Sequence, residues 1–149
     1  MTLSLRLLTI LYVSMLTSCS NSAPVDANSI VVVKTNQHPF LVDHNRELRT
    51  VDKEGNTIDD AELYTDSGEG CNSYLFDTDQ TYTVIDCNGH WYLINKKTGK
   101  IDNNTWQWQK ELPASYIGTF KRAAGQIEYS LTKENNITLE QVYQVKDPR

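Results

Sequence analysis

The sequence predicts a mainly β fold: a small antiparallel barrel or sandwich of meander hairpins, with one short helix. Short runs of β-branched and aromatic residues alternate with turn residues along most of the chain. Asn-Gly and related Gly-containing turns separate these runs at the spacing of hairpins. Both faces of the best-defined strands are apolar, so the sheet must be covered on both sides or closed on itself.

The first residues have the pattern of an export signal. Arg6 precedes an apolar run over residues 7–16, which is shorter than the roughly 20 residues that a spanning helix needs. The run ends in Leu16-Thr17-Ser18-Cys19. This motif resembles the lipobox of bacterial lipoproteins. The alternative is an ordinary signal peptide in which Cys19 is incidental.

The resemblance covers only the leader and Cys19. It implies a signal peptide over residues 1–18, cleavage before Cys19, and lipid on that cysteine that anchors the chain in a membrane. In lipoproteins of enterobacterial type, an Asp after the cysteine favours retention in the inner membrane. Ser20 therefore implies the outer membrane, with the domain facing the periplasm.

The rest of the chain predicts a tether and one domain. Residues 19–29 comprise the lipidated cysteine and a small, polar stretch without periodicity, which indicates a flexible tether. Residues 30–149 suit a single β-rich domain. Its first strands are expected over residues 30–33, 40–42 and 48–51, the last turning through Gly55 into residues 57–58.

An antiparallel meander is predicted over residues 71–102. If Asp79 is the centre of the first hairpin, Tyr74 faces Val84 and Cys71 faces Cys87. Opposed residues in a non-hydrogen-bonded pair have Cα atoms about 4.5 Å apart, within reach of a disulfide. Export to an oxidising compartment favours that disulfide, which would stabilise the fold by about 3 kcal/mol.

The next turns complete the meander. Asn88-Gly89 predicts a two-residue turn that sets Val84 opposite Leu93, and Gly99 occupies a turn position that needs positive φ. One face of the predicted meander then holds Cys71, Leu75, Ile85, Cys87 and Tyr92. The other face holds Tyr74, Phe76, Tyr82, Val84 and Leu93.

The C-terminal third has weaker patterns. Trp106 and Trp108 alternate with Gln107 as in a strand. Residues 113–124 predict a helix that ends at Gly125, and residues 127–131 predict a strand. Residues 137–145 share strand parity, but Thr138 and Gln141 also fit a helical capping box. We favour the strand there, because these residues follow a turn and a matching strand.

Candidate catalytic and metal-binding patterns are weak, and we expect no enzyme activity, no metal and no cofactor. The histidines His38, His44 and His90 have no metal-ligand spacing. Asp77 and Asp79 begin like a calcium loop, but Tyr82 stands where its glycine is required. The adjacent acids Asp59 and Asp60 would point to opposite faces of a strand.

Charge asymmetry indicates the kind of partner. Residues 43–86 carry 12 acids and 3 bases, whereas residues 87–149 carry 6 acids and 9 bases. An acidic half favours a cationic partner and disfavours nucleic acid, although surface acids more often form only a solvated face. The candidate partner-binding residues are Asp59, Asp60, Glu62, Asp66, Glu69, Trp106 and Trp108.

Two functions fit these features. The first hypothesis is a lipid-anchored, non-enzymatic binding protein, most concretely an inhibitor or immunity protein against a cell-wall hydrolase or toxin. The second is a structural or assembly lipoprotein that contacts peptidoglycan or an outer-membrane complex. In the second case Trp106 and Trp108 would stack on sugar rings, whereas buried tryptophans would belong to the core.

Overall fold

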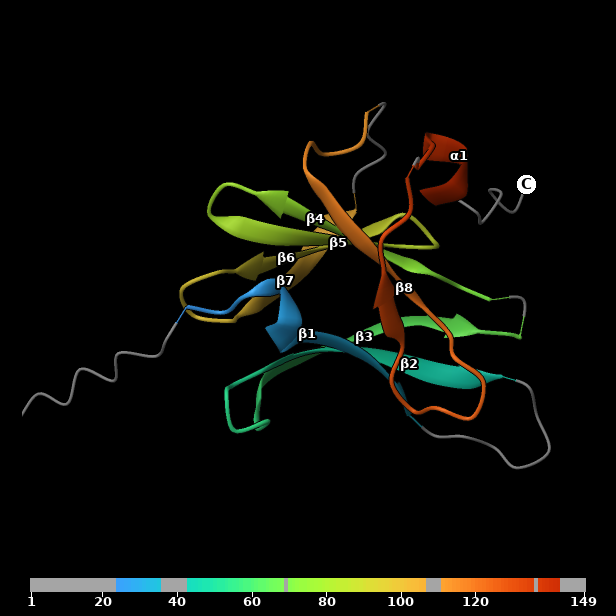
Figure 1. The fold of residues 1–149 in the computed structure, drawn as a ribbon, viewed down its shortest axis with the longest axis horizontal. Helices are drawn as coiled ribbons and strands as arrows, with labels where there is room; N and C mark the ends of the chain where they lie inside the picture. The colour runs from blue at the N-terminus through green and yellow to red at the C-terminus, as the bar shows by residue number, and fades with distance from the viewer. Residues whose placement is uncertain (1–23, 36–42, 69, 107–110, 136, 143–149) are drawn as a thin grey trace, which may run out of the picture.

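Two antiparallel sheets form a sandwich-like arrangement in the computed structural model (Figure 1). The structure describes residues 24–35, 43–68, 70–106, 111–135 and 137–142. The predicted mainly β class is confirmed, and of the two predicted architectures the sandwich is the one formed. The expected strand at residues 40–42 lies outside the described residues. No helix among the described residues is long and apolar enough to cross a membrane.

The smaller sheet has three strands that follow one another along the chain, β1 (Ile30–Thr35), β2 (His44–Val51) and β3 (Thr57–Asp66). A turn with Gly55 at φ +86° joins β2 to β3. The Asp52 carboxylate stabilises this turn by accepting hydrogen bonds from the backbone N–H groups of Glu54 and Asn56, at 3.0 and 2.7 Å.

The larger sheet has the strand order β7-β6-β5-β4-β8-β9. Four of its strands form the predicted meander, and β8 and β9 add to the free side of β4. The strands are β4 (Ser73–Thr78), β5 (Thr81–Asp86), β6 (His90–Asn95), β7 (Ile101–Trp106), β8 (Tyr116–Lys121) and β9 (Ser130–Thr132).

The predicted register of the β4–β5 hairpin is wrong by one residue. Tyr74 faces Ile85 rather than Val84, because the turn is a two-residue loop of Asp79 and Gln80 instead of one centred on Asp79. Asp79 has φ +42°, which such tight turns require. A one-residue slip exchanges the faces of one strand relative to the other, so Leu75 shares its face with Val84.

The β5–β6 register is also shifted by one residue. The loop has three residues, 87–89, and not two, so Val84 faces Tyr92 instead of Leu93. Gly89 has φ +84° and its N–H donates to Asp86 O at 2.8 Å. Three-residue hairpin loops commonly combine a turn with a glycine in the left-handed region. The turn before β7 has the expected positive φ at Gly99.

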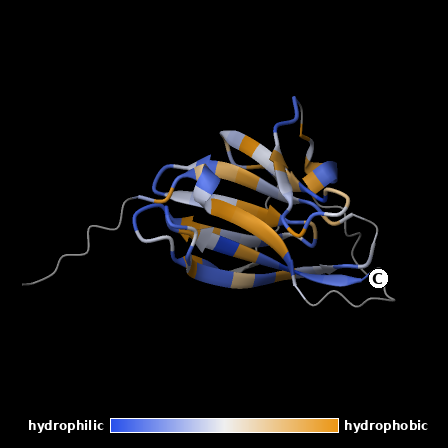
Figure 2. Ribbon diagram, turned by 60° about the horizontal axis from the view of Figure 1, so that its bottom comes forward, coloured by the Kyte–Doolittle hydropathy of each residue, from blue (hydrophilic) through white to orange (hydrophobic). Residues whose placement is uncertain are grey.

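Apolar side chains cover both faces of the larger sheet, as the sequence predicts. Figure 2 shows the hydrophobic residues along the strands. On the inner face, Leu75, Val84 and Ile94 of the larger sheet join one core cluster with Val32 and Leu48 of the smaller sheet. Each of these five side chains is essentially inaccessible to solvent. The outer face forms a second cluster of Tyr74, Phe76, Ile85, Trp91 and Val142. Val142 belongs to α1 (Leu139–Val142), so the short helix covers this face.

The predicted helix over residues 113–124 is wrong, and the predicted strand over residues 137–145 is wrong for the part that the structure describes, which ends at Val142. Residues 116–121 form β8 instead of a helix, because β4 and β9 offer pairing on both sides. Gly118 suits that strand: a Cβ there would lie 2.9 Å from Leu131 Cδ1. Residues 139–142 form α1, because the capping box outweighs strand parity, with Thr138 N–H donating to Gln141 Oε1 at 2.8 Å.

The packed domain starts closer to the N-terminus than the composition of residues 24–29 suggests. Residues 24–29 were expected to belong to the flexible tether, yet Val25 is only 6% exposed and lies in the inner core. Its N–H donates to Lys96 O at 2.7 Å. Asp26 caps the 3₁₀ helix η1 (Ala27–Ser29) by accepting from Asn28 N–H at 2.8 Å. The packed domain therefore begins before Ile30.

Candidate protein-binding face

The outer face of the smaller sheet carries the candidate site. Ala61 and Leu63 of β3 point into the core, so the alternating residues Asp60, Glu62 and Tyr64 point outward. On β2, the same alternation directs Arg46, Leu48 and Thr50 inward. We call the outward set the acidic face; it consists of Glu47, Arg49, Asp60, Glu62 and Tyr64.

Charge on the acidic face is not balanced. Glu47 lies directly opposite Glu62, and Arg49 lies opposite Asp60. The Arg49 Nε donates to Glu47 Oε1, so the one guanidinium of this face is bound to Glu47. Asp60 and Glu62 are exposed and form no ion pair with any described residue. Within the described part of the chain, two carboxylates without an ion-pair partner therefore lie on one strand.

Tyr64 adds an apolar element to the acidic face. Its side chain is 48% exposed, and Tyr64 is one of the few large hydrophobic residues exposed among the described residues. Tyrosine combines a large ring with a polar hydroxyl and is enriched among the residues that dominate binding energies. An exposed tyrosine beside two unpaired acids suits contact with a basic protein surface.

A buried ion pair lies beneath Tyr64. Arg46 of β2 and Asp86 of β5 are both fully buried, and the guanidinium donates to Asp86 Oδ1 at 2.9 Å. Asp86 Oδ2 accepts the Tyr64 N–H at 2.9 Å, and the same Arg46 nitrogen donates to Tyr64 O at 3.3 Å. The pair thus fixes the backbone of the exposed tyrosine from inside the sandwich.

Ser73 and Tyr129 complete the surroundings of this pair. The Ser73 hydroxyl donates to Asp86 Oδ1 at 2.7 Å and accepts from Arg46. The guanidinium carbon lies 5.1 Å from the centre of the Tyr129 ring, a cation–π contact. Arg46 Nε has no hydrogen-bond partner among the described residues. Breaking a buried pair of this kind leaves an uncompensated charge.

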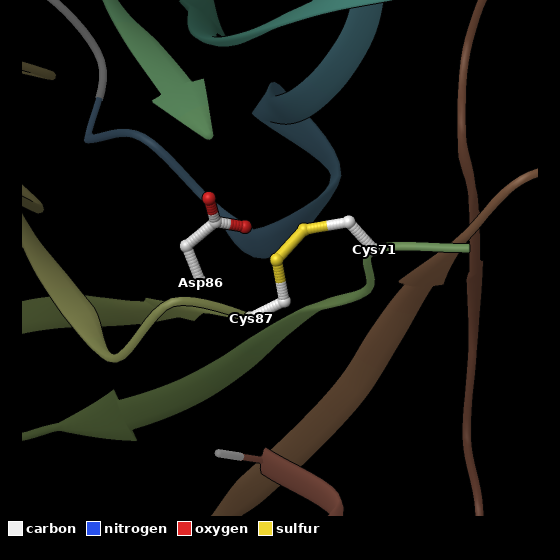
Figure 3. A group of neighbouring side chains, drawn as sticks. All are labelled: Cys71, Asp86 and Cys87. Atoms are coloured by element: carbon white, nitrogen blue, oxygen red, sulfur yellow. A yellow bond between two sulfur atoms is a disulfide. The ribbon is translucent and has the colours of Figure 1, made fainter. Parts of the chain in front are cut away.

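The predicted Cys71–Cys87 disulfide is present, with Cα atoms 5.5 Å apart (Figure 3). It forms despite the shifted register, because Cys71 precedes the first residue of β4 and Cys87 follows the last residue of β5. Arg46 also donates to Cys71 Sγ at 2.9 Å. The disulfide and the buried pair therefore form one continuous unit.

Cys71, Asp86 and Cys87 bring their donor atoms within 4.8 Å of one another, which is metal-ligand spacing. The two sulfur atoms are bonded to each other, so they are not available as thiolate ligands. Both oxygens of Asp86 already accept hydrogen bonds from Arg46, Ser73 and Tyr64. The chemistry of this group is that of a structural link.

A second buried cluster joins His44, Asp66 and Tyr129. His44 Nε2 lies 2.8 Å from the Tyr129 hydroxyl, which donates to Asp66 Oδ2 at 3.3 Å. The other Asp66 oxygen accepts from Gly68 N–H at 2.8 Å and Gly70 N–H at 3.2 Å. These residue types suit acid–base chemistry, but all three side chains are enclosed.

Ionisation of this cluster follows its contacts. Burial acts to raise the pKa of Asp66, but the amide hydrogen bonds from Gly68 and Gly70 and the nearby His44 outweigh it and lower that pKa. Burial, with the Asp66 charge, raises the pKa of Tyr129 to about 12 despite the opposing effect of Arg46. The cluster therefore favours an ionised Asp66 and a neutral Tyr129.

The other predicted site residues are dispersed. Asp59 accepts from Ile101 N–H at 2.9 Å and so links β3 to β7. Asp66 is buried and serves the interior instead of the surface. Glu69 and Trp108 lie outside the described residues, as does the side chain of Trp106, which ends β7 opposite His90. Among the predicted acids that the structure describes, Asp60 and Glu62 are the two that meet on one exposed face.

Sequence reasoning did not select Tyr64 or Glu47. The alternation of Asp60, Glu62 and Tyr64 with Ala61 and Leu63 would have identified an amphipathic strand with an outward tyrosine. The pairing of Glu47 with Glu62 depends on the β2–β3 register.

No protein-family model, no curated protein and no solved structure matches this chain. Its function is therefore inferred from its own residues and geometry.

Proposed function

We propose that this chain is a lipid-anchored, non-enzymatic binding protein of the bacterial outer membrane that faces the periplasm. Its acidic face would bind the basic surface of a protein, most concretely a cell-wall hydrolase or toxin that it inhibits or to which it confers immunity. The anchor is proposed from the lipobox at Cys19. The binding role is proposed from the acidic face.

One observation carries the binding role: Asp60 and Glu62 are exposed, form no ion pair with a residue that the structure describes, and lie beside the half-exposed Tyr64. Complementary charge accelerates encounter and selects partners, while a central aromatic residue supplies much of the binding energy. The buried Arg46–Asp86 pair holds the Tyr64 backbone in place. A site fixed in advance loses less entropy when it binds.

The enclosed polar clusters favour binding over catalysis. His44, Asp66 and Tyr129 combine residue types that enzymes use, but each is buried in hydrogen bonds within the sandwich. A catalytic group must reach its substrate. The acidic face, by contrast, is open to a macromolecule.

A charge-reversal experiment tests this function. The Asp60→Lys/Glu62→Lys variant and wild type would be used to capture purified basic cell-wall hydrolases and toxins encoded beside this gene. We expect wild type to bind one of them in a salt-sensitive way and the variant to bind on the order of tenfold more weakly. Glu111→Lys/Glu140→Lys makes the same charge change at exposed positions elsewhere and is the matched control.

Two results would count against the proposal. Equal weakening in both variants would mean that net charge matters and the acidic face does not. Sedimentation with purified sacculi, unaffected by reversal of Asp60 and Glu62, would favour the alternative of a peptidoglycan-contacting envelope lipoprotein. That alternative depends on Trp106 and Trp108, whose side chains lie outside the described part of the chain.

A further inference from the structure

The N-terminal segment is fixed to one end of the sandwich. Val25 packs in the core and its N–H donates to Lys96 O at 2.7 Å, while Asp26 caps η1. The turns at residues 52–56 and 96–98 lie at the same end, where Figure 1 shows the chain entering the domain. The loop at residues 87–89 lies at the other end of β5.

The distance from the proposed anchor to this end is short. Six peptide units connect Cys19 to Val25, and a fully extended chain of that length spans about 20 Å. A folded domain of this size is wider than that distance, with a radius of gyration of about 13–14 Å. A lipid on Cys19 would therefore hold this end of the domain next to the bilayer.

The surface at this end suits contact with lipid. A groove of about 480 Å³ opens there, with apolar walls formed by Pro24, Val25, Val51 and Ile58. The remaining lining residues are polar or charged: Asp26, Ser29, Asp52, Lys53, Glu54 and Thr98. A surface that combines apolar and polar side chains suits the boundary between acyl chains and head groups.

We propose that the end of the domain around this groove rests on the phospholipid bilayer, and this inference depends on the lipid anchor in the proposed function. The strand β3 begins at this end with Thr57 and leads away from it. At about 3.3 Å per residue, Tyr64 lies roughly 23 Å along β3 from Thr57. The membrane contact thus leaves the acidic face accessible from the periplasm.

Hydrogen exchange measured by mass spectrometry tests this orientation. The lipidated mature protein would be placed in vesicles of phosphatidylethanolamine and phosphatidylglycerol and compared with the same chain lacking Cys19 in solution. We expect amides at residues 52–56 and 96–98 to exchange about fivefold or more slowly on vesicles, with little change at residues 87–89. Equal slowing at both ends, or none at either, would overturn the proposal.

A variant with a longer tether is the matched control. About ten Gly and Ser residues inserted between Ser22 and Ala23 keep the lipid but release the distance constraint. We expect the protection at residues 52–56 to fall towards its value in solution. Protection that persists would show that the short tether does not impose the contact.

The intact mass of the mature protein shows whether Cys19 carries lipid. An unlipidated mass would overturn both the anchor and the orientation, whereas capture of a hydrolase by the acidic face would be unaffected.

Discussion

The two sheets meet along two edges, which we call seams, and each seam is held by different interactions. At one seam, β1 pairs with residues 127–129 through the backbone: Lys34 N–H donates to Ile127 O at 2.9 Å, and Tyr129 N–H donates to Val32 O at 2.8 Å. At the other, β3 meets the larger sheet through side chains. Tyr92 donates its hydroxyl to Glu62 O at 2.9 Å, and Asp86 accepts from Tyr64 N–H.

This difference bears on function. An unpaired strand edge offers its backbone to other chains, but the β3 edge at Glu62 and Tyr64 is occupied by Tyr92, Asp86 and Arg46. The outward side chains of the same residues stay open. The side-chain seam thus blocks pairing by the edge of β3 while it presents the acidic face.

The largest expected effect comes from removing one member of the buried pair. Asp86→Ala leaves the Arg46 charge enclosed without a carboxylate and should lower the free energy of unfolding by about 3–5 kcal/mol. Urea denaturation at pH 7 measures it. Replacing both members with apolar residues, as in Arg46→Met/Asp86→Leu, should cost much less. A small loss in Asp86→Ala would show that the side-chain seam depends little on this pair.

The disulfide beside the pair should have the next largest effect. Cys71→Ser/Cys87→Ser removes a link across a sequence separation of 16 residues and should lower the unfolding free energy by about 3 kcal/mol. The loss should equal the effect of a reductant on wild type in the same denaturation assay. If the reductant also destabilised the double variant, its effect would have another origin.

The pH dependence of stability distinguishes Tyr129, which belongs to both seams. Tyrosine in an unfolded chain ionises near pH 10, whereas burial raises the pKa of folded Tyr129 to about 12. The unfolded state therefore loses its proton first, and stability should fall as the pH rises from about 10 to about 12. Burial also raises the pKa of Tyr74 and Tyr92, so Tyr129→Phe should make this fall shallower without abolishing it. The variant should also cost about 1 kcal/mol at neutral pH, through its lost hydrogen bonds. An unchanged alkaline profile would contradict the assignment.

The smallest effect concerns Glu62. It faces Glu47 directly, and like charges in opposed positions destabilise a sheet, so Glu62→Gln should stabilise the fold by a few tenths of a kcal/mol. The same change should weaken binding to a basic partner. Thermal unfolding and a binding titration measure the two effects. If Glu62→Gln lowered the stability instead, the pairing of Glu62 with Glu47 would not destabilise the fold.

Sequence reasoning predicted local features well where the chemistry was local. The mainly β class, the disulfide and the turn at Gly99 follow from residue types and short spacings. Registers depend on loop lengths that differ by one residue, and both meander registers were displaced for this reason. β8 was missed because its helical periodicity competes with pairing partners supplied by distant strands.

The candidate site was predictable only in part. Net charge identified the acidic half, and alternation identifies Asp60 and Glu62 as neighbours on one face. Arg46 and Asp86 lie 40 residues apart in sequence, and no local pattern indicates that they meet. Asp66 resembled its neighbours in composition but is buried, because His44, Tyr129 and two glycine amides surround it.

Carboxyl footprinting of a complex tests the central claim most directly. Surface acids would be modified with a carbodiimide and an amine, with and without a captured basic hydrolase or toxin, and located by mass spectrometry. We expect the partner to protect Asp60 and Glu62 and to leave Glu111 and Glu140 reactive, since all four are exposed in the free chain. Protection of Glu111 and Glu140 with unchanged labelling of Asp60 and Glu62 would contradict binding at the acidic face.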